Sequence, residues 1–225
     1  MTDILAHPIL TGSIYPVRSN TRTPVISDGS AEYRLIPEEG CPPSGLLARL
    51  FSMIAFNKML ARGDTATSWD NIHQIFADMG TKESGANLAI LKKNLTAFNR
   101  TTISTPYGPL HLRIENLGGC LLVTADEDLV GLIHEQGVKL SLDAVHKLRG
   151  KGIGGVPIDL YAWAVSISQR GAAKGVIPWS EIACRTALSN NANLPLYFSK
   201  SMDLVNQVCQ VISAKTTKEG LVIDN

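Results

Sequence analysis

The chain has 225 residues and a mass of 24.2 kDa, enough for one large domain or two small ones. Hydrophobic residues make up 44% of it and charged residues 18%, a balance that supports a folded core and excludes a strongly charged disordered chain. With 21 Lys and Arg against 20 Asp and Glu, the net charge of +1 lacks the basic excess that is typical of nucleic-acid-binding proteins.

The amino-terminal sequence and the hydropathy pattern predict a cytoplasmic protein. Residues 1–17 have no basic stretch and are interrupted by an aspartate and two prolines, so a signal peptide is not expected. The best apolar run, 46–60, contains Arg49 and Lys58, so no membrane span is expected. The four cysteines include no CxxC pair and are interpreted as buried thiols in a reducing compartment.

Residues 1–40 are predicted to form an N-terminal arm. They contain several prolines and many Ser and Thr residues, and no helical or strand period is sustained. Three basic and five acidic residues give this stretch a net charge of −2. We expect such an arm to be partly ordered or docked on a partner.

Residues 41–124 are predicted to form the first domain. Apolar residues at helical spacing predict helices over 44–61 and 83–99, with a shorter helix between them that begins at Ser68 as its N-cap and ends at Gly80. Strands separated by Pro and Gly turns follow at 101–104, 110–114 and 120–124. A helix-turn-helix followed by a β-hairpin is the order of a winged helix.

Residues 125–225 repeat this plan loosely and are predicted to form a second winged-helix domain. The predicted fold class is therefore α+β and mostly helical, with two winged-helix units in tandem. The elements expected here are a helix to about 136, a strand at 138–140, helices at 142–148 and 158–167, a strand at 176–179, helices at 180–188 and 198–212, and a hairpin at 216–222.

Enzyme motifs fail at the positions that their chemistry needs. The glycine-rich stretch 150–155 looks like a phosphate-binding loop, but its lysine is followed by glycine instead of Ser or Thr, and a hinge loop explains it. His134 and Glu135 begin a metalloprotease-like pair that lacks its second histidine. Helix capping explains the acidic run 126–128 more simply than a metal does. The sequence predicts no enzyme, no metal and no cofactor.

The start of the helix at 83–99 has the side chains of a DNA-reading surface. The second helix of a helix-turn-helix presents its first residues to base edges in the major groove, and Lys82, Ser84 and Asn87 have suitable donors and acceptors. The outward face of the helix is expected to carry Lys92, Lys93, Asn94 and Arg100. The three basic residues among these would lie near phosphates. A solvated face of a packing helix is the alternative interpretation.

The last predicted helix and hairpin offer a second surface of the same kind, with the same alternative. Its basic candidates are Arg185, Lys200, Lys215 and Lys218. The charge is unevenly distributed between the two domains. Residues 41–120 hold 8 basic and 5 acidic residues, a net +3, whereas residues 121–225 hold 10 of each. The excess therefore falls in the unit with the stronger helix-turn-helix pattern.

An ordered set of motifs resembles the RepA-type replication initiator proteins of plasmids, a family of tandem winged-helix initiators. The residues that carry the resemblance are 158–164, 177–181, Phe198 and the terminal 219–222. The resemblance implies a protein without a catalytic site that binds double-stranded DNA at repeated origin sites. It also implies recruitment of host replication proteins and a monomer–dimer equilibrium. An Asn-rich stretch at 189–196, where such proteins tend to carry charge, weakens the second surface more than the first.

We therefore expect a sequence-specific double-stranded DNA-binding protein that initiates plasmid replication. Two alternatives stay open. The same fold serves in transcriptional repressors, and winged helices also act as adaptors that bind other proteins and no DNA.

Overall fold

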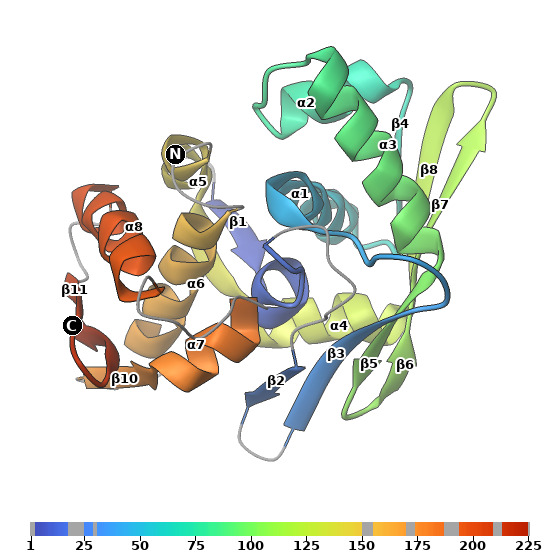
Figure 1. The fold of residues 1–225 in the computed structure, drawn as a ribbon. Helices are drawn as coiled ribbons and strands as arrows, with labels where there is room; N and C mark the ends of the chain where they lie inside the picture. Colours follow the sequence, from blue (N-terminus) through green and yellow to red (C-terminus); the bar gives the residue numbers. More distant parts are fainter. Residues whose placement is uncertain are drawn as a thin grey trace.

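Two sets of elements with the same order and the same strand pairing make up most of the molecule (Figure 1). In each set a helix is followed by a strand, two helices and an antiparallel hairpin, and the strand joins the hairpin in a three-stranded sheet. In the first set an additional hairpin at 101–110 comes before the one that joins this sheet. The strand orders are β4-β8-β7 and β10-β12-β11. This is the arrangement of a winged helix, so the fold is α+β with two such units, as predicted. The computed structural model describes residues 3–17, 25–28, 31–149, 155–169, 174–186, 194–208 and 213–224.

The first unit is built around α1, an 18-residue helix that ends at Gly63 in the left-handed conformation. Its side chains pack against β4 and α3, and Phe51 lies 5.7 Å from Trp69 and 5.4 Å from Phe98 between ring centroids. The elements of this unit are α1 (Gly45–Arg62), β4 (Ala66–Trp69), α2 (Ile72–Asp78), α3 (Gly85–Asn99), β7 (Leu112–Leu117) and β8 (Cys120–Ala125).

The start of α2 differs from the prediction. Ser68 was expected to cap this helix, but it lies in β4, opposite Leu122 of β8. Pairing of β4 with β8 buries Trp69 in the core, and this burial outweighs the helical spacing of Trp69 with later apolar residues. The N-cap is Asn71 instead, whose side-chain oxygen accepts a hydrogen bond from the backbone N–H of Gln74.

The second unit begins at Val156 and not at residue 125. The second and third helices of this unit pack together through Trp179 and Phe198, whose ring centroids are 6.0 Å apart. The last helix starts four residues before Phe198, because Pro195 fits the first turn of a helix, where no N–H is needed. The elements of this unit are α6 (Val156–Gln169), β10 (Lys174–Pro178), α7 (Trp179–Thr186), α8 (Leu194–Val208), β11 (Ser213–Thr216) and β12 (Gly220–Asp224). The glycine-rich stretch 150–154 lies outside the described residues.

The N-terminal residues are built into both units, which differs from the arm that the sequence predicts. β1 (Asp3–Ala6) pairs with β9 (Val138–Ser141), and the π-helical turn η1 (Ile9–Ser13) contacts both α1 and α6. Residues 6–17 are buried, and the ring of Tyr15 packs edge-on against Phe98 at 5.6 Å. The missing sequence period has a physical reason, since a segment buried on several sides needs no polar face.

Two further strands of this N-terminal region extend a sheet that lies outside the winged-helix plan. β2 (Val25–Asp28) and β3 (Ala31–Pro37) join the hairpin formed by β5 (Thr101–Thr105) and β6 (Gly108–Leu110) in the order β2-β3-β5-β6. The three strands expected after α3 are therefore four, which form two hairpins. The first completes this four-stranded sheet, and the second, β7–β8, is the wing.

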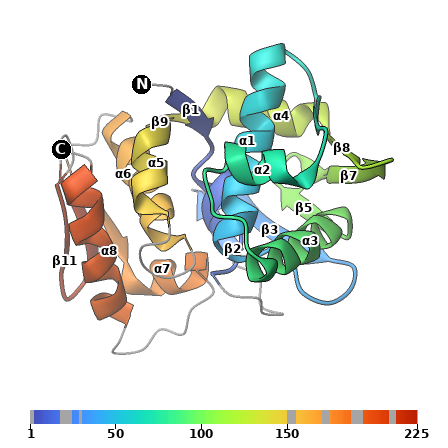
Figure 2. The same cartoon turned by 90° about the horizontal axis from the view of Figure 1, so that it is seen from above.

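Residues between the units form a connector that contacts both. It consists of α4 (Glu127–Gln136), β9 (Val138–Ser141) and α5 (Leu142–Leu148). In Figure 2, α5 lies between α8 and the helices of the first unit, and α5 contacts α8 and α6. From the end of α5, Arg149 reaches the first unit and donates to the backbone oxygen of Met79 at 3.2 Å.

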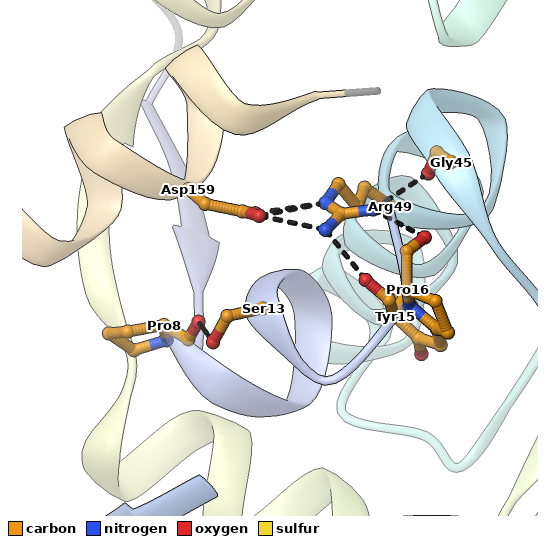
Figure 3. A network of polar contacts seen from close by, with 7 residues as sticks. All are labelled: Pro8, Ser13, Tyr15, Pro16, Gly45, Arg49 and Asp159. Carbon is orange, nitrogen blue, oxygen red and sulfur yellow. Dashed lines mark hydrogen bonds and ion pairs between the residues drawn. The ribbon is translucent and has the colours of Figure 1, made fainter. Parts of the chain in front are cut away.

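A buried ion pair also joins the units. Arg49 on α1 and Asp159 on α6 both have fully buried side chains, and their closest atoms are 2.8 Å apart (Figure 3). The remaining Arg49 donors bind backbone oxygens of the N-terminal residues and of α1: Nη2 to Tyr15 at 2.6 Å and Nη1 to Gly45 and Pro16 at 3.1 and 3.4 Å. The first helices of the two units are thus held together through the N-terminal segment.

Within the described part of the chain, helices long and apolar enough to cross a bilayer are absent.

Candidate nucleic-acid interface

The turn between α2 and α3 sets the position of the candidate reading helix. Gly80 adopts a left-handed conformation (φ +59°), which lets the chain reverse after α2. Arg149 and His146 from α5 pack directly over this glycine. Burial lowers the pKa of His146, and the nearby Arg149 charge lowers it further while Asp143 opposes the shift. The connector therefore supports the turn from behind.

Lys82, Ser84 and Asn87 lie together at the start of α3, and part of their bonding capacity is used locally. Ser84 is the N-cap, and its hydroxyl oxygen accepts from the backbone N–H of Asn87 at 3.2 Å. The Asn87 side-chain amide donates to the backbone oxygen of Lys82 at 2.7 Å. The spacing of Ser84 and Asn87 is that of an N-cap and its third helical residue, a signal that is legible in the sequence. Contact of these three side chains with bases stays a prediction.

Lys92 and Lys93 are both exposed on α3, as expected, whereas Asn94 is not. The Asn94 side chain is buried, where it accepts from the backbone N–H of Ser44 and donates to the Ser44 oxygen. Its position three residues after Leu91 and four before Phe98 places it on the apolar stripe, so helical spacing alone predicts the inward orientation.

A cleft of about 560 Å³ separates the reading helix from the wing. Asn99, which lines this cleft at the end of α3, bonds β7 twice: it donates to the oxygen of Ile114 at 2.7 Å and accepts from the Ile114 N–H at 2.6 Å. This pair fixes the wing relative to α3. The polar side chains that line the cleft are Asn71, His73, Lys92, Thr96, Asn99 and Asn116.

Arg100, just past the end of α3, is paired with an acidic residue. Its Nη1 lies 3.2 Å from Oε2 of Glu39, and both side chains are more than half exposed. An exposed pair of this kind contributes little to stability, but it partly neutralises a cation that the sequence assigned to phosphates.

Two features of this surface were not anticipated from the sequence. Ile90, three residues after Asn87 on α3, leaves 49% of its surface exposed, and an exposed apolar side chain on a helix that enters the major groove can contact a thymine methyl group. His73 and Glu83 form a pair with 2.6 Å between Nδ1 and Oε2, which joins α2 to the start of α3. One residue lies in α2 and the other, ten positions later, in the turn before α3, so no periodic signal links them and only the fold reveals this pair.

The second unit presents its predicted cations on separate elements. Lys200 is exposed on α8, Lys215 lies on β11, and Lys218 is exposed in the turn of the hairpin. Trp179 holds this hairpin against α7 by donating from Nε1 to the backbone oxygen of Thr217 at 3.0 Å. Arg185 lies in α7, but its side chain is outside the described residues.

The acidic run at 126–128 lies at the start of α4, where the helix dipole favours negative charge, but the Asp126 side chain makes no capping hydrogen bond to this helix. Asp126 is the residue that precedes α4, and its Oδ2 accepts from the backbone N–H of His111 at 2.8 Å. Across the described ranges, His, Cys, Asp and Glu form no group of three or more that could hold a metal ion.

Comparison with known proteins gives a likeness in fold. The chain matches no family model and no curated protein sequence. Among solved structures, the crystal structure of RctB domains 2-3 aligns with a TM-score of 0.54 at 13% sequence identity, covering 96% of this chain and 94% of that chain. At this identity the likeness establishes a shared fold that extends over both winged-helix units.

Proposed function

We propose that this protein is a sequence-specific double-stranded DNA-binding protein that initiates plasmid replication at repeated origin sites. The observation that carries the proposal is the pairing of two winged-helix units whose whole arrangement, over 96% of the chain, matches that of RctB domains 2-3. RctB is a replication initiator. The motifs that resemble RepA-type initiators lie in the second unit and support the same assignment.

The first unit supports DNA binding by its surface chemistry. Its reading helix begins with exposed polar residues, continues with two adjacent lysines, and borders a polar cleft beside the wing. Polar contacts to base edges and cations near phosphates are the two components of specific DNA recognition. We propose that α3 enters the major groove and that α8 presents the second reading surface. The protein would then act by binding and assembling partners, without a catalytic site.

A gel-shift titration with the DNA that flanks the gene tests the proposal. The full chain is expected to bind one duplex specifically, with an affinity that falls steeply between low and moderate salt. Lys92→Gln should weaken specific and non-specific duplexes alike and reduce the salt slope by about 0.9 if the lysine contacts one phosphate. Lys139→Gln, which removes the same charge from an exposed position on β9, is the matched control. Absence of any shifted duplex at low salt would favour the protein-binding adaptor.

A replication assay separates the initiator from a repressor with the same fold. The gene supplied in trans should maintain a plasmid that carries only the origin. Specific DNA binding without maintenance of that plasmid would instead support a repressor.

A further inference from the structure

A carboxylate lies beside the start of the candidate reading helix. Glu83 immediately precedes Ser84, the N-cap of α3, and its Oε2 lies 2.6 Å from Nδ1 of His73 on α2. The two side chains are 38% and 69% exposed, respectively, so the pair sits at the surface and not in the core. It spans the two helices of the helix-turn-helix at the end that would point into the major groove.

A negative charge at this place needs a reason. Glu83 would approach the phosphate backbone, which repels it, and its neighbours Lys82 and Ser84 are residues suited to DNA. A carboxylate is tolerated at a reading position when it accepts a hydrogen bond from a base amino group. His73 engages Oε2, and the described contacts leave Oε1 as the acceptor for such a group.

The pattern of groups in the major groove selects one base. Guanine and thymine present only acceptors there, which repel a carboxylate. Adenine presents its N6 amino group beside the N7 acceptor, whereas cytosine presents the N4 amino group alone. Cytosine is therefore the base that a single carboxylate oxygen accepts from with the least repulsion.

We propose that Glu83, held in place by His73, reads one cytosine of the DNA site through its N4 amino group. The inference rests on the proposed function and assigns a specificity-determining residue to the same surface. Glu83 makes the base contact. His73 is a positioning residue that fixes the carboxylate before DNA arrives, so that fewer side-chain torsions are immobilised on binding.

Selection from a duplex library with 20 randomised base pairs tests this, with the full chain in each case. The wild-type motif should contain one position with a strong cytosine preference. Glu83→Gln should lower that preference by roughly tenfold and move it toward adenine, because a glutamine amide pairs with N6 and N7 of adenine. Preferences at the other positions should stay unchanged. Glu135→Gln, which removes an exposed carboxylate from α4, should reproduce the wild-type motif.

Variants of His73 separate positioning from general stability. His73→Ala should reduce the preference at the cytosine position only, and His73→Asn, which keeps a donor near the place of Nδ1, should restore it. A loss of fold would change every position or abolish binding, and thermal unfolding of each variant identifies that case. Both side chains are exposed, so Glu83→Gln is expected to fold normally.

The outcomes distinguish the two proposals. If the wild type enriches a motif and Glu83→Gln enriches the same motif with the same preferences, the role of Glu83 is overturned while DNA recognition stands. If Glu83→Gln only raises affinity for all duplexes, the carboxylate acts as a charge and reads no base. If the wild type enriches no motif at all, the proposed function itself fails and the inference fails with it.

Discussion

Arg49 uses all five of its N–H donors in a site from which solvent is excluded, and Asp159 takes two of its three nitrogens (Figure 3). Arg49 lies on the first helix of one winged-helix unit and Asp159 on the first helix of the other. Burial raises the pKa of the Asp159 carboxyl group, while the charge and the hydrogen bonds of Arg49 lower it. The pair therefore joins the first helices of the two units directly.

Removal of either partner should destabilise the fold strongly. Arg49→Met leaves the Asp159 carboxyl group buried without its cation, and the expected loss is about 3–5 kcal/mol in the free energy of unfolding. Asp159→Leu should lower the free energy of unfolding by a similar amount, because it leaves the Arg49 cation buried without its carboxylate. The double variant should lose less than the sum, since no unpaired charge is left. Urea unfolding of the four proteins measures the coupling, and strictly additive losses would contradict the proposed role of the pair.

Gly80 provides a test of the turn before α3. Its left-handed φ disfavours any side chain, and an added Cβ would fall into Arg149 and come within 2.9 Å of His146. Gly80→Ala should therefore lower the free energy of unfolding by about 1–3 kcal/mol. It should also weaken DNA binding, because His146 and Arg149 can no longer pack against the turn before α3. Thermal unfolding and gel shifts measure the two effects.

Gly85→Ala is the matched control for that substitution. Gly85 is the first residue of α3, and an added Cβ has nothing within 4 Å. Alanine there should leave stability unchanged or raise it by up to about 1 kcal/mol. Equal destabilisation by both substitutions would show that the packing of α5 over Gly80 is unimportant.

Tyr15 makes stability depend on alkaline pH. Burial raises the pKa of its hydroxyl group to about 12, although Ser52 and Arg49 act in the opposite direction. In the unfolded chain the group ionises near pH 10. The contribution of the Tyr15 hydroxyl group to the free energy of unfolding is therefore fully present below pH 10. It falls as the pH rises toward 12, by about 1.4 kcal/mol at pH 11.

Tyr15→Phe isolates this contribution from other ionisations. The variant loses the 3.0 Å hydrogen bond to Ser52 and should be less stable at pH 8. The difference between wild type and variant should shrink as the pH rises from 9 to 11. Urea unfolding at several pH values measures it. A constant difference over this range would mean that the Tyr15 hydroxyl group ionises normally in the folded protein.

Local sequence patterns predicted most elements of the two units, because amphipathic helices and hairpins have a period of their own. The helix at 44–61, the hairpin around Gly118 and Gly119, and the strand that precedes α7 all follow from such patterns. The pattern misled at Ser68, where pairing with β8 and burial of Trp69 outweigh a local cap signal. Tertiary burial commonly overrides such local preferences.

Contacts between residues far apart in the chain could not be predicted from local sequence patterns. Arg49 and Asp159 are 110 residues apart, and in the sequence each is a single charged residue within an apolar helix, with nothing to indicate its partner. The N-terminal segment has no period because it is buried against both units. Of the candidate site, the cations on α3 were predictable from their outward positions, whereas the engagement of Arg100 by Glu39 depends on where β3 ends.

That engagement leads to a last prediction. If Arg100 lies beside a phosphate, Glu39 competes for its charge in the free protein and adds its own repulsion to the backbone. Glu39→Gln should therefore raise affinity for all duplexes and steepen the salt dependence by up to about 0.9 in the log–log slope. Arg100→Ala should remove this gain, so the double variant should bind no better than Arg100→Ala alone. Salt titrations of the four proteins measure both effects. A gain from Glu39→Gln that persists without Arg100 would mean that Glu39 acts only through the net charge, and that Arg100 lies away from the DNA.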